Sequence, residues 1–149
     1  MATKSKASDC AVKILDAVPP TVWFIRGQMR RHRKGLSVPQ FRALYFINDN
    51  PSVSLSAVAE HLAASLPSTS RMMAALESQS LIKRGGGRGD RRVIELIITG
   101  KGATVMDSAR AATLAQIDSK LEQLGAAQRL SLGKAMELLR KLFDPERKS

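Results

Sequence analysis

The apolar positions in the first part of the chain follow a helical pattern. Six of them recur at alternating steps of four and three residues, the spacing of one continuous apolar stripe on a helix: Ala11, Leu15, Val18, Val22, Ile25 and Met29. Pro19 and Pro20 interrupt this stripe without shifting its phase. The pattern therefore predicts a kinked or briefly broken helix pair, which ends at Gly35.

The next residues combine capping residues with helical apolar spacing. Ser37 is predicted to cap a helix from Val38 to Asp49, and Ser54 is predicted to cap another helix that begins at Leu55. The apolar residues of this second helix lie one turn apart: Leu55, Val58, Ala59 and Leu62. Both segments are expected to pack one face against a common core.

A turn of small residues, Ala63 to Ser65, leads into a further helix. This helix is predicted to begin at Leu66, with Pro67 in its first turn, where the missing N–H costs nothing. One face is expected to point inward: Thr69, Met72, Met73 and Leu76. The opposite face carries Pro67, Arg71, Ala74 and Ser78. Two helices joined by so short a turn predict a helix-turn-helix.

Extended segments follow this pair of helices. Strands are predicted at Leu81 to Arg84 and at Val93 to Ile98, around a glycine-rich loop from Gly85 to Arg92. The second strand is so apolar that one of its faces must pack on the helices. Thr99 is expected to cap a long helix that runs to about Leu124. After a glycine break, a last helix carries the apolar stripe Leu132, Ala135, Met136, Leu139, Leu142 and Phe143.

This order of elements predicts a mainly α fold with a small β-wing, which is a winged helix-turn-helix lobe plus a helical dimerisation region. The predicted division is an N-terminal helical dimerisation segment at 1–36, a winged lobe at 37–103 and a C-terminal helical dimerisation segment at 104–149. The apolar stripes of the terminal helices are too extensive for one small lobe to cover. A homodimer is therefore expected.

Positive charge is concentrated in two regions of a chain with a formal net charge of +11. Between Ala17 and Asn48 there is no acid, and the basic residues there are Arg26, Arg30, Arg31, Arg33, Lys34 and Arg42. The second region has Asp90 as its single acid, among Lys83, Arg84, Arg88, Arg91 and Arg92. Clustered charge of this kind next to a helix-turn-helix predicts a polyanionic partner, double-stranded DNA.

The second helix of a helix-turn-helix, the recognition helix, lies in the DNA major groove with its N-terminal residues closest to the bases. The predicted contact residues here are Ser65, Pro67, Ser68, Ser70 and Arg71. Arg71 is the one long donor among them, and it either reads a guanine or clamps a phosphate. Ser65 is either a DNA contact or only a helix cap.

The loop between the predicted strands is the candidate wing contact. A narrow minor groove attracts inserted arginine, and this glycine-rich loop presents Arg88 near its tip with Arg91 and Arg92 nearer its base. Phosphates repel a carboxylate, so Asp90 is interpreted as a brace that holds one of these arginines in place.

Other chemistry finds little support in the sequence. His32 and His61 have no carboxylate or thiol nearby at metal-ligand spacing, and the glycines 85–87 lack the Lys-Ser/Thr of a phosphate loop. No metal, cofactor or enzymatic activity is therefore predicted. Cys10, the one cysteine, fits a reducing cytoplasm, and no basic residue closer than Lys13 activates it for a redox role. No apolar run approaches the roughly 20 residues of a membrane span, so a cytoplasmic protein without a membrane partner is expected.

The segment from Leu36 to about Ala112 resembles the MarR family of winged-helix transcription regulators. The resemblance rests on the entry to the second helix, Leu36 to Phe41, and on the helix-turn-helix, Ala57 to Glu77. Its most specific part is Asp90-Arg91-Arg92 followed by a strand and then Ile98-Thr99-Gly100-Lys101-Gly102. The chain departs from the family pattern at the end of the recognition helix, where Ser80 replaces a glycine.

The resemblance implies a homodimer that reads a pseudo-palindromic operator, with Arg92 reaching the minor groove and Asp90 bracing the wing. It also implies a ligand crevice between the dimer helices and the DNA lobe. We place a small-molecule effector near Trp23, Phe24, Phe41 or Tyr45. The predicted function is a ligand-responsive regulator, more specifically a repressor. A weakly specific architectural DNA-binding protein and a protein-interaction module stay open as alternatives.

Overall fold

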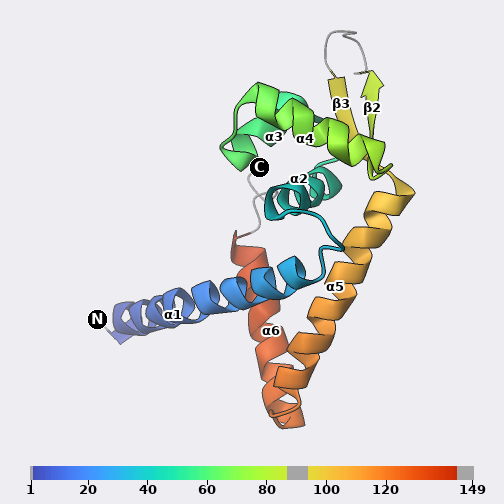
Figure 1. Ribbon diagram of the computed structural model, residues 1–149. Coiled ribbons are helices and arrows are strands. Elements are labelled where there is room, and N and C mark those ends of the chain that lie inside the picture. Colours follow the sequence, from blue (N-terminus) through green and yellow to red (C-terminus); the bar gives the residue numbers. More distant parts are fainter. Residues whose placement is uncertain (1, 87–93, 144–149) are drawn as a thin grey trace. The chain divides into compact units, whose positions relative to one another are not determined.

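The computed structural model describes residues 2–86 and 94–143 and shows the predicted mainly helical fold with a small sheet (Figure 1). Its elements are α1 (Ala2–Arg31), α2 (Val38–Asp49), β1 (Val53–Ser54), α3 (Leu55–Leu62), α4 (Leu66–Ser78), β2 (Ile82–Gly86), β3 (Ile94–Ile98), α5 (Gly100–Leu121) and α6 (Ala126–Phe143). The strands form one antiparallel sheet in the order β1-β3-β2. The predicted fold class is thus confirmed.

Contacts within the chain define two units, residues 1–113 and 114–149, and each is described by itself. The predicted division at residues 36 and 103 stays a prediction. The second unit holds the end of α5 and all of α6. The N–H of Gly125 donates to Gln128 Oε1 at 2.9 Å, where the predicted break separates the two helices. No side chain of α6 is buried, so its apolar stripe is exposed within this chain.

Of the two predicted forms of the first helix, the break is wrong, because α1 runs without interruption from Ala2 to Arg31 with Pro19 and Pro20 inside it. The kink stays a prediction. A proline removes one N–H donor from the helical ladder and leaves a carbonyl four residues earlier without its partner. The hydroxyl of Thr21 donates to the carbonyl of Ala17 at 2.7 Å in this region. The carbonyls that Pro19 and Pro20 leave free are those of Leu15 and Asp16, four residues earlier, and both residues are exposed, so water solvates these carbonyls and the helix continues.

The helix starts of the winged lobe lie where the sequence places them. Ser37 and Gln40 form a reciprocal capping box at α2, with N···O distances of 3.3 and 2.9 Å. The Ser54 hydroxyl accepts from the N–H of Ala57 at the start of α3. These caps satisfy N–H groups that the first helical turn leaves free.

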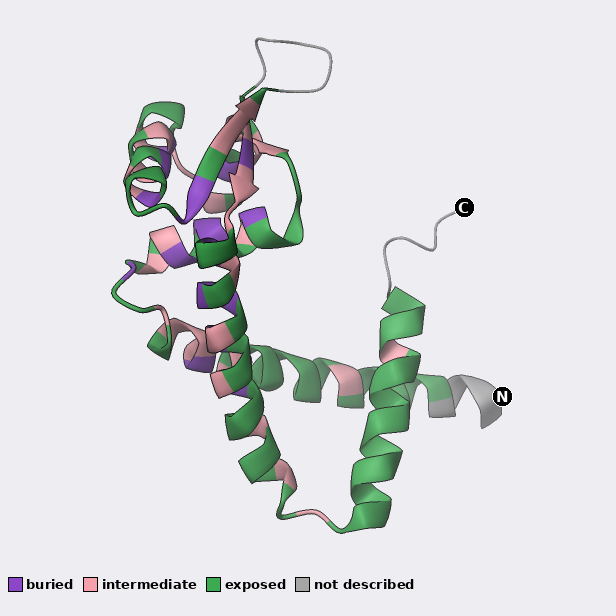
Figure 2. Ribbon diagram, turned by 90° about the vertical axis from the view of Figure 1, so that its right-hand side faces the viewer, coloured by how far each residue is buried: buried purple, intermediate pink, exposed green. Residues whose placement is uncertain are grey.

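The core of the first unit lies in the winged lobe, where the buried residues concentrate (Figure 2). It combines side chains from α2, α3, α4, the sheet and the first turns of α5. The largest fully buried side chains are Leu44, Ile47, Met73, Leu76, Ile82, Leu96, Val58 and Thr69. Met29, near the end of α1, packs against the same cluster. Leu96 confirms the prediction that one face of the second wing strand packs on the helices.

Candidate nucleic-acid interface

The turn between α3 and α4 is built from backbone hydrogen bonds. The N–H of Ala64 donates to the carbonyl of Ala59, and the N–H of Ala63 donates to the carbonyl of Glu60, both at 3.0 Å. This pair of bonds closes a helix through a left-handed residue, here Ala63 with φ 51°. The chain then reverses within three residues, so α4 begins directly after α3.

The two faces of α4 differ in burial as the sequence predicts. Thr69, Met73 and Leu76 are buried, whereas Pro67 and Arg71 are exposed. Thr69 is satisfied within the fold, because its hydroxyl donates to the carbonyl of Ser65 at 2.9 Å. The inner face of α4 therefore holds the helix against the core, and the side chain of Arg71 on the other face stays accessible.

The serines at the start of α4 have unequal freedom. The Ser65 hydroxyl accepts from the N–H of Ser68 at 3.3 Å, so Ser65 is the N-cap of α4. Ser68 and Ser70 are half-buried at the flanks of the helix. Capping leaves the hydroxyl proton of Ser65 free to donate, so its role as a DNA contact stays a prediction.

The connection from α4 to the wing has the same type of helix ending. The N–H of Leu81 donates to the carbonyl of Leu76, and the N–H of Ser80 donates to the carbonyl of Glu77. Ser80 adopts the left-handed conformation, with φ 60°. Glycine adopts this conformation without steric cost, which explains why a glycine suits the position that Ser80 occupies.

The start of α5 ties this connection in place. The Thr99 hydroxyl donates to the carbonyl of Ser80 at 2.6 Å and accepts from the N–H of Gly102 at 3.0 Å. The Lys101 ammonium donates to the carbonyl of Gln79 at 2.9 Å. The segment that carries the resemblance at Ile98 to Gly102 thereby fixes the end of the recognition helix relative to the sheet.

Gly102 has a packing role at the same junction. A Cβ at this position would collide with the carbonyl oxygen of Leu81 and would lie 2.8 Å from Cγ1 of Ile98. The absence of a side chain lets α5 approach the backbone between α4 and β2. The requirement for glycine here comes from close contact, since Gly102 lies within a regular helix.

The wing strands pair in a regular antiparallel register, from Ile82 with Ile98 to Gly86 with Ile94. The sequence placed the end of the first strand at Arg84, and the structure extends it by two glycines. Arg88, Asp90, Arg91 and Arg92 lie outside the described residues, so their predicted roles at the wing stay predictions.

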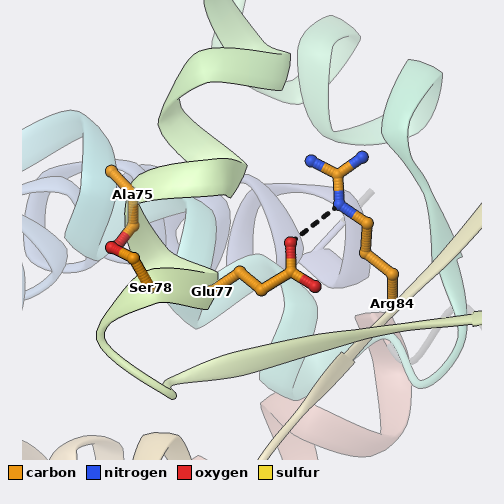
Figure 3. A network of polar contacts seen from close by, with 4 residues as sticks. All are labelled: Ala75, Glu77, Ser78 and Arg84. Carbon is orange, nitrogen blue, oxygen red and sulfur yellow. Dashed lines mark hydrogen bonds and ion pairs between the residues drawn. The ribbon is translucent and has the colours of Figure 1, made fainter.

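Sequence reasoning missed an ion pair at the base of the wing. Arg84, on β2, donates from Nε to Glu77 Oε2, in the last turn of α4, at 3.0 Å (Figure 3). Periodicity gave no sign of it, because the partners lie on different kinds of element across a turn. This arginine belongs to the basic cluster that pointed to DNA, yet a carboxylate of the protein already neutralises it.

The four aromatic residues of the predicted ligand crevice have different surroundings. Phe41 is part of the core, and Phe24 is half-buried. Trp23 is 74% exposed and lines a surface hollow that contains none of the other three. Tyr45 is 41% exposed. The first unit therefore does not gather these rings into one pocket.

Tyr45 and Asp49 are four residues apart on α2, so their side chains lie on the same face of the helix. Burial, and then the negative charge of Asp49, raise the pKa of Tyr45 above its ordinary value of 10.0. The positive charges of Arg110 and Arg26 act in the opposite direction. Tyr45 is therefore an uncharged hydrogen-bond donor at neutral pH, near two arginines.

Within residues 2–86 and 94–143, no group of three or more His, Cys, Asp or Glu side chains is arranged to hold a metal ion. None of the described helices is long and apolar enough to cross a membrane. Cys10 is exposed on α1.

The helix-turn-helix, the hairpin beside it and the three-stranded sheet define a winged-helix protein. Residues 34–93 match the model of the MarR family. The matched segment contains the helix-turn-helix and the first wing strand, in agreement with the resemblance seen in the sequence. The chain is also 22% identical, over 113 residues, to YfiV of Bacillus subtilis, which is described as an uncharacterized HTH-type transcriptional regulator. That similarity covers 76% of this chain and 71% of YfiV.

Solved structures share the fold at low sequence identity. The transcriptional regulator Tm0710 from Thermotoga maritima has a TM-score of 0.81 at 16% identity, over 92% of this chain and 98% of that one. The multiple antibiotic-resistance repressor MarR from Listeria monocytogenes has a TM-score of 0.68 at 14% identity, over 95% and 96%. MepR from S. aureus, solved with ethidium bromide, has a TM-score of 0.61 at 15% identity, over 79% and 88%.

Proposed function

We propose that this protein is a homodimeric, sequence-specific DNA-binding transcription regulator, and more specifically a ligand-responsive repressor of a pseudo-palindromic operator. One observation carries the proposal. Helix α4 is held against the core by Thr69, Met73 and Leu76 while its other face, with Arg71, is exposed next to the wing strands. A major groove admits such a helix, and an exposed guanidinium pairs with a guanine or a phosphate.

The positions of the two DNA-contacting parts support this function. Figure 1 shows α4 beside the base of the β2–β3 hairpin, and the hydrogen bonds of Thr99 and Lys101 fix that junction. The lobe therefore presents the exposed face of α4, for the major groove, beside the two strands that lead into the predicted basic loop. Pre-organisation of this kind lowers the entropic cost of binding.

The proposed dimer rests on apolar surface that the chain itself leaves uncovered. On α1 the exposed large members of the predicted stripe are Leu15, Val18 and Val22. On α6 the exposed large apolar residues are Leu130, Leu132, Met136, Leu138, Leu142 and Phe143. A second copy covers such stripes and brings two recognition helices to a spacing of about 34 Å, one turn of DNA.

Binding of a small molecule is proposed to control the affinity for DNA. The fold relative MepR was solved with ethidium bromide, a planar aromatic compound. In this chain the candidate contacts are Trp23, Phe24 and Tyr45, with Phe41 as part of the core behind them. An effector acts here only if it binds the DNA-competent and DNA-incompetent spacings of the lobes with different affinity.

A salt-titrated binding assay tests the proposal, with duplex DNA from upstream of the protein's own gene against a scrambled duplex. Six to ten phosphate contacts produce a loss of about 10³–10⁵ in affinity between 50 and 200 mM salt. We expect that loss together with tighter binding of the upstream duplex, at a stoichiometry of two chains per site. Equal affinity for both duplexes would support the architectural alternative. Weak binding that does not respond to salt would support a protein-interaction module.

A further inference from the structure

A surface hollow of about 660 Å³ lies where α1 ends and the chain turns toward α2. Its lining consists of Trp23, Gly27, Arg30, Arg31, Arg33, Lys34 and Gly35. The volume is in the range of small-molecule sites. All of these residues belong to the first unit, and none of them is on α4 or the wing.

Four of the seven lining residues are cations. Arg30 and Arg31 occupy the last turn of α1, and Arg33 and Lys34 lie in the turn that follows. In the part of the chain that the structure describes, no carboxylate lies within ion-pair distance of any of them, and the nearby sequence from 17 to 48 contains no acid. Two arginines would suffice to interact with the partial negative charge at the C-terminal end of α1. Four cations around one hollow repel each other until an anion binds.

The turn after α1 brings Arg33 and Lys34 to the same hollow as Arg30 and Arg31. Lys34 has a φ of 47° and Gly35 a φ of 82°, and the N–H of Leu36 donates to the carbonyl of Arg33 at 3.1 Å. Two successive left-handed residues fold the chain back sharply. A lysine is uncommon in that conformation, and here it adds its ammonium group to the three arginines.

Trp23 is the aromatic residue in the lining of the hollow. Trp23, Gly27, Arg30 and Arg31 are spaced at i, i+4, i+7 and i+8, so they share one face of α1. Trp23 is 74% exposed, and a Cβ added at Gly27 would meet no atom within 4 Å. Gly27 therefore places no side chain between Trp23 and the two arginines that follow on this face of α1.

We propose that this hollow binds a nucleoside diphosphate or triphosphate, with the base stacked on Trp23 and the phosphates held by Arg30, Arg31, Arg33 and Lys34. Guanidinium groups pair with phosphate oxygens in bidentate geometry, and every nucleobase has a face that stacks on an aromatic ring. Two or three linked phosphates match four cations, whereas a simple aromatic carboxylate would leave most of them unneutralised. A free nucleotide is favoured over duplex DNA, since stacked, paired bases do not expose a face to the indole.

Trp23 is the one tryptophan of the chain, so its fluorescence reports directly on the hollow. The full-length protein is titrated with ADP and ATP, and binding is measured in parallel by calorimetry. Adenosine, inorganic triphosphate, benzoate and a single-stranded oligothymidylate are titrated in the same way. We expect saturable binding of ADP and ATP that changes the fluorescence of Trp23, and weaker binding of adenosine and benzoate by about tenfold or more.

Variants separate the hollow from general positive charge. Arg30→Gln and Arg33→Gln each remove one guanidinium, and Gly27→Phe adds a bulky side chain to the lining at a position where a Cβ meets no atom within 4 Å. Each is expected to weaken ADP binding by about tenfold. Arg42→Gln, an exposed arginine outside the hollow, is the matched control and should bind ADP as the unmodified protein does. Thermal unfolding confirms that all four variants are folded.

Four results would overturn the nucleotide site. Two concern small ligands: no saturable binding of ADP or ATP by either method, or binding of benzoate or adenosine as tight as that of ADP. The others are tighter binding of oligothymidylate than of ADP at this hollow, and equal losses of ADP affinity in Arg42→Gln and Arg30→Gln.

The nucleotide site shares Trp23 with the proposed effector contacts and so rests on that part of the proposed function, whereas it does not depend on DNA binding by α4 and the wing. Absence of ADP and ATP binding in the unmodified protein, with operator binding intact, would refute the nucleotide site alone. Loss of operator affinity in Arg71→Ala with intact ADP binding would leave the nucleotide site standing.

Discussion

Arg84 of the wing strand β2 donates from Nε to Glu77 Oε2 at 3.0 Å and so joins the wing to the last turn of α4. Both side chains are partly exposed, and pairs of this kind contribute about 0.2–1 kcal/mol to stability. The importance of the pair is geometric. It links the two elements that are proposed to contact DNA, and it removes one guanidinium from the charge available to phosphates.

Glu77→Gln keeps the size of the side chain and removes its charge. We expect a small loss of stability, about 0.5 kcal/mol, and tighter binding to scrambled DNA because Arg84 becomes available to phosphates. The ratio of affinities for upstream and scrambled duplex should therefore fall. The charge-swapped double variant Glu77→Arg with Arg84→Glu restores the pair and is expected to recover most of the ratio. An unchanged ratio in Glu77→Gln would show that the pair has no part in DNA selection.

Arg71→Ala tests whether the exposed face of α4 reads bases. If Arg71 contacts a guanine, the variant loses about 1–3 kcal/mol of binding free energy for the operator and discriminates less at one base pair. Arg92→Ala, on the wing, should weaken binding to all sequences more evenly. Competition binding with a set of operators that carry single substitutions measures both effects. Small and equal losses in the two variants would contradict the proposed DNA face.

Elements with strong local signals could be predicted from the sequence. Ser37, Ser54 and Ser65 each precede a helix at an N-cap position, and all three helices begin where those serines place them. The inward face of α4 followed from apolar spacing alone. Caps and periodicity are properties of a few neighbouring residues, so no tertiary information is needed to recognise them.

Features that depend on tertiary packing could not be predicted in this way. The proline pair suggested a break in α1, but the helix runs through it on an exposed surface. The pairing of Glu77 with Arg84 and the convergence of Trp23 with four cations join residues whose proximity depends on turns. The left-handed residues Ala63 and Ser80 also carry no local signal, because alanine and serine seldom adopt that conformation.

Gly102→Ala is expected to destabilise the winged lobe by about 1–3 kcal/mol, the usual cost of overpacking. The added methyl group would collide with the carbonyl oxygen of Leu81, which is backbone and cannot move aside cheaply. Gly100→Ala is the matched control, because a Cβ there meets no atom within 4 Å. Chemical denaturation followed by circular dichroism measures both variants. Equal stability of the two would show that α5 does not need this close approach.

Ser80→Gly is expected to stabilise the protein by up to about 1 kcal/mol. A left-handed conformation costs a non-glycine residue about 1–2 kcal/mol, and the greater freedom of glycine in the unfolded chain offsets part of the gain. The hydrogen bond from Thr99 reaches the backbone carbonyl of Ser80, so it survives the substitution. Ser78→Gly, within α4, should instead destabilise by about 0.5–1 kcal/mol. The same denaturation experiment decides the matter, and a loss of stability in Ser80→Gly would contradict the assigned strain.

Titration of the Tyr45 phenol tests how burial and the neighbouring charges change its pKa. Tyr45 is the one tyrosine of the chain, so the ultraviolet absorbance of its phenolate can be titrated without ambiguity. Burial and the neighbouring Asp49 raise its pKa above 10.0 in the folded protein. The resulting stabilisation is fully present below pH 10 and is lost as the pH rises through the folded-state pKa. Asp49→Asn should lower the phenol pKa toward its ordinary value, and Tyr45→Phe should lose less stability above pH 10 than the unmodified protein does. A phenolate that forms at or below pH 10 in the folded protein would contradict the raised pKa of Tyr45.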